Sequence, residues 1–224
     1  LTPLFSWKDK FGILLEPFRP KGSDPEETLA SFVKRRLGTS ILNYAVDPFV
    51  SGVYAGSPET IIPKYALPKL YALEENYGSF IRGSIHKMKE PKKATKKVFS
   101  AKGGLSRLIE KLTEKIGLEN MVLGVKDFCV SLNGNTFIVN ANGTSTEFSK
   151  VVFTGSARRL PEAFPFLKEN GLDAAFNVSY TPVMEVAVGF KKWQGMPLDG
   201  FGALMPSKEN RKILGVLFLS SLFT

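Results

Sequence analysis

The sequence predicts an α+β protein in which a helical domain with a mainly antiparallel sheet is interrupted by a smaller α/β segment. Residues 1–95 carry apolar residues at helical spacing along most of their length. Residues 96–157 begin with a helical pattern and continue as alternating strands separated by the turn sequences NGN and NANG. Residues 158–224 return to loop and helix and then to long apolar runs. This order indicates two interleaved domains, with boundaries near residues 95 and 157.

The best-marked helix lies in the stretch SDPEETLASFVKRRLG. We expect Asp24 to be its N-cap, Pro25 its first helical residue and Glu27 the partner of Asp24 in a capping box. Gly38 follows three basic residues and is expected to end the helix, because glycine readily takes the left-handed conformation that closes helices. The spacing also predicts a helix over residues 40–49.

The other elements are predicted either from apolar residues at helical spacing or from the alternation typical of strands. Helices are expected in KYALPKLYALEENYG, in SFIRGSIHKMK and between Gly103 and Gly117. Strand patterns, rich in β-branched and aromatic residues, occupy residues 121–132, 135–141, 145–155, 181–193, 199–207 and 211–221. The last three predict long apolar strands of the larger sheet.

The residue inventory argues against several kinds of chemistry. Cys129 is the single cysteine and His86 the single histidine, so we expect neither a metal site nor a Cys/His nucleophile pair. No apolar run reaches the roughly 18 to 20 residues that span a bilayer. The hydrophobic content of 43% is enough for a sizeable core.

The net charge of +9 is concentrated in residues 87–102, which carry seven lysines and one glutamate. One interpretation is a solvated, flexible connection between packed units. Another is attraction to an anionic membrane surface or a polyanionic ligand. Nucleic acid is not expected as a partner, because no helix-turn-helix, zinc or RNA-binding signature accompanies the lysines.

The two ends of the chain are unusually apolar. The chain begins with LTPLFSW and finishes with GVLFLSSLFT, so we expect it to be an interior segment of a longer protein. Because no targeting pattern is visible, a bacterial cytoplasmic location is expected, with peripheral contact to the cytoplasmic membrane left open.

Several segments resemble one known family when they are taken together in order. They are FVSGVYAGSPETIIPKYALPKLYALEENYGSFIRGSI, GGLSRLIEKL, KVVFTGSARRL and PLDGFGALMPSKENRKILGVLFLSSLF. This series is similar to the flavin-dependent protoporphyrinogen and coproporphyrinogen oxidases of haem biosynthesis, within the amine-oxidase-like flavoprotein superfamily. The resemblance covers nearly the whole chain, and GVYAGSP and GFGALMPSKE are its most specific parts.

The resemblance implies a role for each domain and a cofactor, FAD. Residues 1–95 and 158–224 would belong to the substrate-binding domain, and residues 96–157 to part of the FAD-binding domain. In this family the flavin takes a hydride from a meso carbon of the porphyrinogen, a pyrrole nitrogen loses a proton, and molecular oxygen is the acceptor. No catalytic side chain and no metal is implied.

Two family features are missing from the sequence. A search for GxGxxG finds only GFG at residues 200–202, which does not open a helix. The arginine that binds a substrate propionate in this family would lie upstream of Leu1. We therefore expect the chain by itself to be inactive and to bind FAD weakly or not at all.

The resemblance implies three substrate-binding positions in the expected substrate domain. Gly52 and Gly56 match a glycine-rich turn whose backbone follows the edge of the tetrapyrrole, where a missing side chain lets a carbonyl approach a pyrrole N–H. The alternative is a helix C-cap at Gly52 followed by a helix start at Ser57 and Pro58. Phe190 matches an aromatic residue that packs on a substrate ring, and its alternative is a place in the core.

Further positions follow from the motif FTGSARRL and from LGVKDF. Ala157 matches an apolar residue at the substrate cavity, although Ser156 replaces the proline of the family pattern Thr-x-Pro. The next two residues, Arg158 and Arg159, are either propionate ligands or exposed loop residues. Val125 and Thr154 match cofactor-binding positions near the adenine and the dinucleotide, with strand core as the alternative.

Two other functions remain open from the sequence. One is a non-enzymatic, basic module that binds a membrane surface or an anion. The other is a related flavin amine oxidase, which GVYAGSP and PSKENRK argue against. The expected partners are thus a tetrapyrrole, molecular oxygen and, as an open question, a membrane surface.

Overall fold

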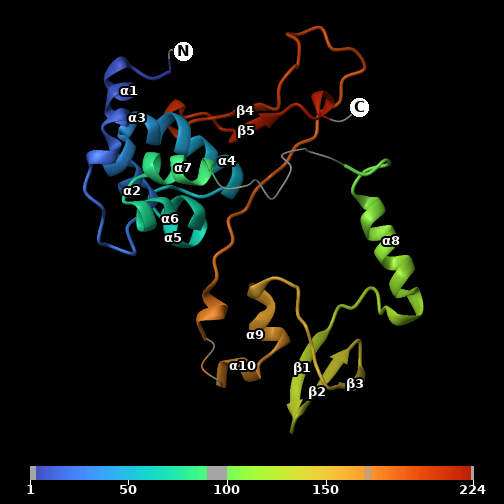
Figure 1. Ribbon diagram of the computed structural model, residues 1–224. Helices are drawn as coiled ribbons and strands as arrows, with labels where there is room; N and C mark the ends of the chain where they lie inside the picture. The colour runs from blue at the N-terminus through green and yellow to red at the C-terminus, as the bar shows by residue number, and fades with distance from the viewer. Residues whose placement is uncertain (1–3, 90–99, 170, 172, 223–224) are drawn as a thin grey trace. The chain divides into compact units, whose positions relative to one another are not determined.

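The computed structural model describes residues 4–89, 100–169, 171 and 173–222, and it divides into two compact units (Figure 1). The first unit comprises Leu1–Lys97 and Thr181–Thr224, and the second comprises Val98–Tyr180. The chain therefore leaves the first unit, builds the second and returns, as the order of the sequence patterns predicts. Most of the lysine-rich stretch, residues 90–99, lies outside the described residues.

The first unit is built mainly from short helices around one apolar core. Its helices are α1 (Trp7–Leu14), η1 (Glu16–Phe18), α2 (Leu29–Leu37), α3 (Thr39–Ile41), the π-helix η2 (Leu42–Val46), α4 (Asp47–Tyr54), α5 (Pro63–Ala66), α6 (Pro68–Tyr77), α7 (Phe80–Met88), η6 (Ser207–Glu209) and η7 (Leu219–Ser221). The core residues come chiefly from α2, with contributions from its neighbours, and they are Leu29, Ala30, Phe32, Val33, Leu42, Val50 and Phe80. Because the α2 positions recur at three and four residues, one face of this helix is buried.

Helix α2 starts later than the sequence predicts. Its N-cap is Thr28, whose side chain accepts a hydrogen bond from the Ser31 N–H, so the assignment of the cap to Asp24 is wrong. The reason is tertiary: the Leu29 N–H donates to the Ile61 carbonyl at 2.7 Å, and the next amide donates to a neighbouring loop carbonyl. Those partners satisfy the first helical amides from outside the segment. The predicted end at Gly38, with φ 94°, is confirmed.

The helix predicted over residues 40–49 is longer and less regular than expected. Three elements, α3, η2 and α4, follow one another without a gap from Thr39 to Tyr54. The helix ends at Ala55, which takes the left-handed conformation with φ 49°. A C-cap at Gly52 is therefore wrong. Burial of Val50 and Ser51 keeps the segment helical beyond the predicted end.

The long strands predicted near the C-terminus are mostly absent from the described residues. Only β4 (Gly202–Leu204) and β5 (Gly215–Leu217) pair, and they form an antiparallel hairpin. No described strand pairs with residues 181–193, which take no regular structure. A strand pattern produces a strand only where a neighbouring strand completes its hydrogen bonds. The composition alone therefore predicted longer strands than the described residues form.

The second unit combines helices with a three-stranded antiparallel sheet. Its helices are α8 (Ser106–Ile116), η3 (Leu118–Asn120), η4 (Ala157–Arg159), α9 (Leu160–Ala163), α10 (Phe166–Glu169) and η5 (Asp173–Asn177). The strands β1 (Phe128–Asn133), β2 (Thr136–Ala141) and β3 (Thr144–Phe148) pair in chain order. Asn142 and Gly143, with φ 48° and 79°, form the predicted turn between β2 and β3, since positive φ at both positions suits a tight hairpin. Together the units confirm the α+β class.

The boundary expected at residue 157 requires correction, because the second unit continues to Tyr180. Ala163 and Phe164, which follow η4, are buried against Val130 of β1. The Phe164 ring also lies 5.2 Å from the ring of Phe153, centroid to centroid. This packing attaches the α9 segment to the sheet.

Candidate functional site

In the first unit, α4 lies against the hairpin formed by β4 and β5. Gly52 is the residue at which they come closest: a Cβ atom added to it would lie 2.5 Å from Leu204 Cδ2. Real Cβ contacts are longer, so only glycine allows this packing without displacing Leu204. We call the exposed apolar residues around this contact the α4–hairpin surface, which comprises Phe49, Val53, Tyr54, Leu204 and Leu217.

The turn of the hairpin is fastened to the start of α4 by Asp47. Its two carboxylate oxygens accept hydrogen bonds from the Ser207 backbone N–H at 2.7 Å and from the Ser207 hydroxyl at 2.8 Å. Lys208 Nζ lies 5.2 Å from the centroid of the Tyr44 ring. A pocket of about 440 Å³ opens beside this contact, lined by Leu42, Asn43, Asp47, Ser57, Pro58, Glu59, Ser207 and Lys208. No sequence pattern connects residues so far apart in the chain.

The C-terminal end of α4 offers backbone acceptors. The last four carbonyl groups of a helix lack intrahelical donors, and in α4 these belong to Ser51–Tyr54, Gly52 among them. The negative end of the helix dipole adds to their acceptor strength. Gly56 follows, and a Cβ atom there would lie 2.8 Å from Ile61 Cδ1. A helix start at Ser57 and Pro58 is wrong, because the chain forms a turn there.

The third predicted substrate residue of this unit, Phe190, is exposed. Its side chain is 62% accessible and meets Trp193 edge-on with the ring centroids 5.0 Å apart. The interpretation of Phe190 as a core residue is therefore wrong for the described structure. Its contact with a substrate ring stays a prediction.

The remaining predicted residues belong to the second unit. Ala157 begins η4, and its N–H donates to Tyr180 Oη at 2.9 Å, a contact that the sequence did not indicate. Val125 is half-buried in the segment before β1, and Thr154 is exposed in the irregular segment after β3. Neither residue lies in a strand, so the alternative interpretation that they belong to the core of a strand is wrong for both. Arg159 lines a pocket of about 300 Å³ beside β1 with Lys126, Asp127, Phe128, Cys129, Asn140, Gly143 and Glu162.

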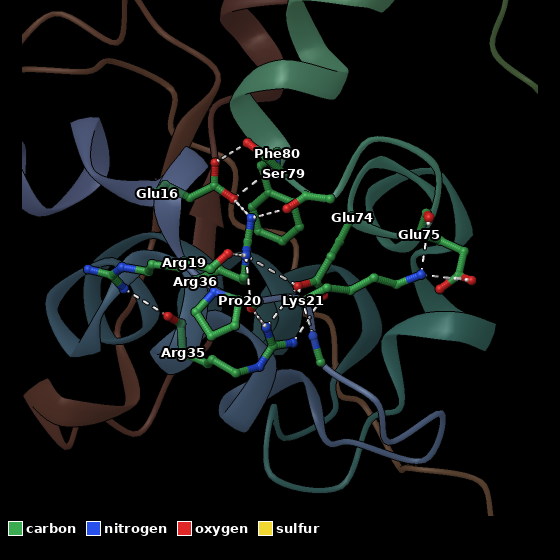
Figure 2. A network of polar contacts seen from close by, with 12 residues as sticks. Glu16, Arg19, Pro20, Lys21, Arg35, Arg36, Glu74, Glu75, Ser79 and Phe80 are labelled. Atoms are coloured by element: carbon green, nitrogen blue, oxygen red, sulfur yellow. Dashed lines mark hydrogen bonds and ion pairs between the residues drawn. The ribbon is translucent and has the colours of Figure 1, made fainter.

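A buried polar network joins three other helices of the first unit (Figure 2). Glu16 is fully buried, and its carboxylate accepts hydrogen bonds from the Ser79 hydroxyl at 2.5 Å, from the Phe80 N–H at 2.9 Å and from the Ile81 N–H at 3.2 Å. It also forms an ion pair with Arg36, which is fully buried as well. The carboxylate thereby satisfies the first amides of α7 and joins η1, α2 and α7.

The environment of Glu16 favours its charged form. Burial by itself raises the pKa of this carboxyl. The hydrogen bonds from Ser79, Phe80 and Ile81 and the charge of Arg36 outweigh that effect, so the pKa lies below its usual value. The partners of the carboxylate all come from the protein, which indicates a structural role, although Nε of Arg36 is buried without a hydrogen-bond partner among the described residues.

A second ion cluster lies beside the first. The Arg35 guanidinium donates to Glu74 Oε1 at 2.8 Å and to Glu27 Oε2 at 2.7 Å. Hydrogen bonds to Glu74 and then to Glu27 raise the pKa of Arg35 above its usual value. Glu27 was expected to close a capping box at the start of α2. It lies before the N-cap of that helix and pairs instead with Arg35 in its last turn.

Comparison with known proteins places the chain in a family. Residues 3–224 match the family model of flavin containing amine oxidoreductases, and the chain belongs to this family. Among curated relatives it is 28% identical to "Protoporphyrinogen oxidase 2, chloroplastic/mitochondrial" of Arabidopsis thaliana, covering 99% of this chain and 51% of the relative. It is also 28% identical to "Protoporphyrinogen oxidase" of Homo sapiens, covering 99% and 49%. The chain thus spans about half the length of the curated relatives it matches.

A solved structure shares the fold. The crystal structure titled "Putative protoporphyrinogen oxidase from Exiguobacterium sp. 255-15" superimposes with a TM-score of 0.72 over 99% of this chain and 48% of the other chain. The sequence identity is 18%, so this likeness concerns the fold. The resemblance expected from the sequence motifs is confirmed.

Proposed function

We propose that this chain supplies the tetrapyrrole-binding part of an FAD-dependent oxidase. The enzyme would convert protoporphyrinogen IX to protoporphyrin IX, or coproporphyrinogen III to coproporphyrin III, with molecular oxygen as the acceptor. The observation that carries the proposal is the α4–hairpin surface, which lies beside the carbonyl end of α4. The names of the relatives supply the substrate class.

The chemistry of a porphyrinogen suits this surface. The macrocycle is large and apolar, and its pyrrole N–H groups are hydrogen-bond donors. The apolar residues of the α4–hairpin surface would bury the ring, and the α4 carbonyl groups near Gly52 would accept from a pyrrole N–H. Phe190, exposed in the same unit, would add an aromatic contact. No side chain of this chain is assigned a proton-transfer role.

The described residues do not by themselves form a dinucleotide cradle. A flavin supplies the hydride acceptor in such oxidases, and its pyrophosphate is typically held by a GxGxxG turn between a parallel strand and a helix. The described sheets are antiparallel, and the sequence lacks that turn. Val125 and Thr154 remain predicted cofactor contacts, and we expect FAD to bind this chain weakly or not at all.

The proposal is tested by titrating the 224-residue chain into protoporphyrin IX and coproporphyrin III and following the porphyrin absorption. We expect binding at micromolar concentration, and about fivefold weaker binding for Phe190→Ala, because one aromatic contact is worth on the order of 1 kcal/mol. Phe18→Ala removes an even more exposed ring elsewhere in the unit and is the matched control. A folded chain, judged by circular dichroism, that binds neither porphyrin contradicts the proposal. Preference for an amine in competition would favour the amine oxidase alternative.

A second proposal concerns attachment to an anionic lipid surface through α1. Trp7, Phe11 and Leu14 recur at four and three residues and are each more than 60% exposed. Lys8 and Lys10 flank them, and Lys10 Nζ lies 4.8 Å from the centroid of the Trp7 ring. An exposed aromatic stripe with adjacent lysines is typical of helices that lie in a membrane interface. No described helix is long and apolar enough to cross a membrane.

Vesicle co-sedimentation tests this attachment. Binding to vesicles with anionic lipid is expected to exceed binding to neutral vesicles and to decrease with salt. Replacing Trp7, Phe11 and Leu14 with serine should reduce it by about tenfold or more. The same replacement at Leu108, Ile109 and Leu112 of α8, which are similarly exposed, is the control. Equal losses in both variants would contradict a specific role of α1.

A further inference from the structure

A basic turn connects the two strands of the hairpin in the first unit. Residues 206–212, PSKENRK, contain one acid and three cations, and the cations are all exposed: Lys208, Arg211 and Lys212. None of the three lies within ion-pair distance of a carboxylate among the residues that the structure describes. Their charges therefore have no ion-pair partner in the described part of the chain.

The backbone of the basic turn is held in place from two directions. Within the hairpin, the Met205 N–H donates to the Leu214 carbonyl at 2.9 Å, and Asn210 takes the left-handed conformation with φ 51°. Toward α4, the Asp47 carboxylate accepts both hydrogen bonds that Ser207 donates. The cations thus extend from a backbone that is attached to the start of α4.

The basic turn lies at one end of the α4–hairpin surface (Figure 1). Ser207 meets Asp47 at the first residue of α4, and Leu204 of the same hairpin meets Gly52 further along the helix. Asp47 and Gly52 are about 7.5 Å apart along the axis, because each helical residue rises 1.5 Å. The carbonyl groups without intrahelical donors lie at the opposite end of α4. Cations, apolar side chains and carbonyl acceptors therefore follow one another along this helix.

This order of groups suits an apolar ligand that carries acids on one edge. Apolar side chains gain free energy by covering an apolar ring, and a carboxylate forms its strongest hydrogen bonds with cationic donors. A tetrapyrrole with propionate side chains has this distribution, because the propionates extend beyond the edge of the macrocycle.

The acids near the basic turn leave this attraction in place. The Asp47 carboxylate is engaged by the two donors of Ser207. Glu59 Oε1 lies 3.4 Å from Lys34 Nζ, so a cation outside the turn offsets its charge. Glu209 is the acid of the turn itself and is outnumbered there by the three cations.

We propose that Lys208, Arg211 and Lys212 bind the propionates of the tetrapyrrole at the edge of the α4–hairpin surface. The inference rests on the proposed function and deepens it, since it names side chains that recognise the acid groups of the substrate. It depends only on residues of the first unit.

The first half of the test removes the charges from the protein. The triple variant Lys208→Gln, Arg211→Gln and Lys212→Gln leaves Asp47 and Ser207 unchanged. Titration followed by porphyrin absorption should give a dissociation constant for protoporphyrin IX about tenfold higher, because each exposed ion pair changes a binding constant by about twofold.

A matched control removes the same net charge elsewhere in the first unit. Two lysines and one arginine are exposed on α6 and α7, and the control variant is Lys69→Gln, Arg82→Gln and Lys87→Gln. Its dissociation constant should stay within about twofold of the unsubstituted chain, since only a general effect of net charge remains. Circular dichroism checks that both variants are folded.

The second half of the test removes the charges from the ligand. The dimethyl ester of protoporphyrin IX keeps the macrocycle and lacks both carboxylates, and it is compared with the free acid in the same dilute non-ionic detergent. The unsubstituted chain should bind the ester about tenfold more weakly than the acid. The triple variant should bind the ester as the unsubstituted chain does, because the cations have no carboxylate left to contact.

Three results would overturn the inference while porphyrin binding by the unsubstituted chain still supports the proposed function. They are an unchanged affinity of the triple variant for the acid, an equal loss in the matched control, and an equal loss for acid and ester in the triple variant. If the folded, unsubstituted chain binds neither the acid nor the ester, the proposed function fails, and the inference fails with it.

Discussion

At the scale of single residues, Gly52 shows how packing determines identity. Glycine inside a helix costs about 1 kcal/mol relative to alanine, so its place in α4 needs a reason. The structure supplies one, because a Cβ atom would fall 2.5 Å from Leu204 Cδ2. The sequence resemblance explained the same glycine by close approach to a substrate. Both explanations require the absence of a side chain on the exposed face of α4.

Gly52 and Leu204 should therefore be energetically coupled. We expect Gly52→Ala to lower the free energy of unfolding by about 1 kcal/mol, because Leu204 must move into a less favourable position. In a chain with Leu204→Ala the same change should raise it by about 0.5 to 1 kcal/mol, since only the helix preference of alanine remains. Urea unfolding of the four chains of this double-mutant cycle measures the coupling. Additive effects would show that the two residues do not interfere.

At the scale of elements, the Glu16 network connects parts of the chain that sequence patterns treat separately. One carboxylate joins the amides of α7 to the Arg36 guanidinium of α2. Its low pKa means that folding favours the charged form. A group whose pKa is lowered by folding stabilises the protein above its unfolded value, here 4.5, and this contribution is lost as the pH falls through the folded value.

Acid should thus weaken the first unit through Glu16. We expect the free energy of unfolding to fall as the pH drops below about 4.5, and Glu16→Gln to flatten this dependence. At neutral pH that variant should lose about 3 to 5 kcal/mol, because the buried Arg36 charge loses its closer carboxylate and keeps only Glu74 Oε1 at 3.4 Å. Glu75→Gln breaks the exposed pair with Lys21 and should cost less than about 1 kcal/mol. Similar losses in both variants would contradict the importance of burial.

At the scale of the whole molecule, each unit has its own apolar core. The first core centres on Phe32 of α2, and the second on Phe164, which follows α9. Because the two clusters share no residue, local opening of one unit need not open the other. Such a chain does not have to unfold in a single two-state transition.

Truncation of each core should show this independence. Phe164→Ala is expected to lose about 3 to 5 kcal/mol and to accelerate hydrogen–deuterium exchange in β1 and β2, with little change in α2. Phe32→Ala should give the opposite pattern. Uniform acceleration throughout the chain in either variant would indicate one cooperative structure instead.

The sequence by itself determined the α+β class, the end of α2 at Gly38, the turn at Asn142 and Gly143, and the family. These features depend on local rules: residue periodicity, glycine at positive φ and contiguous motifs. The candidate site was predicted only as separate positions, because no pattern indicated that Gly52 packs on Leu204.

Only the tertiary structure decided the features that depend on partners distant in the chain. The start of α2 shifts to Thr28 because loop carbonyls such as that of Ile61 accept its first amides. The apolar C-terminal patterns shorten to β4 and β5, because a strand needs a neighbour. The contact between Tyr180 and Ala157 likewise joins residues that no local rule connects. Hydrogen bonds and packing between separated segments are set by the folded backbone, so the sequence reveals them only once that backbone is known.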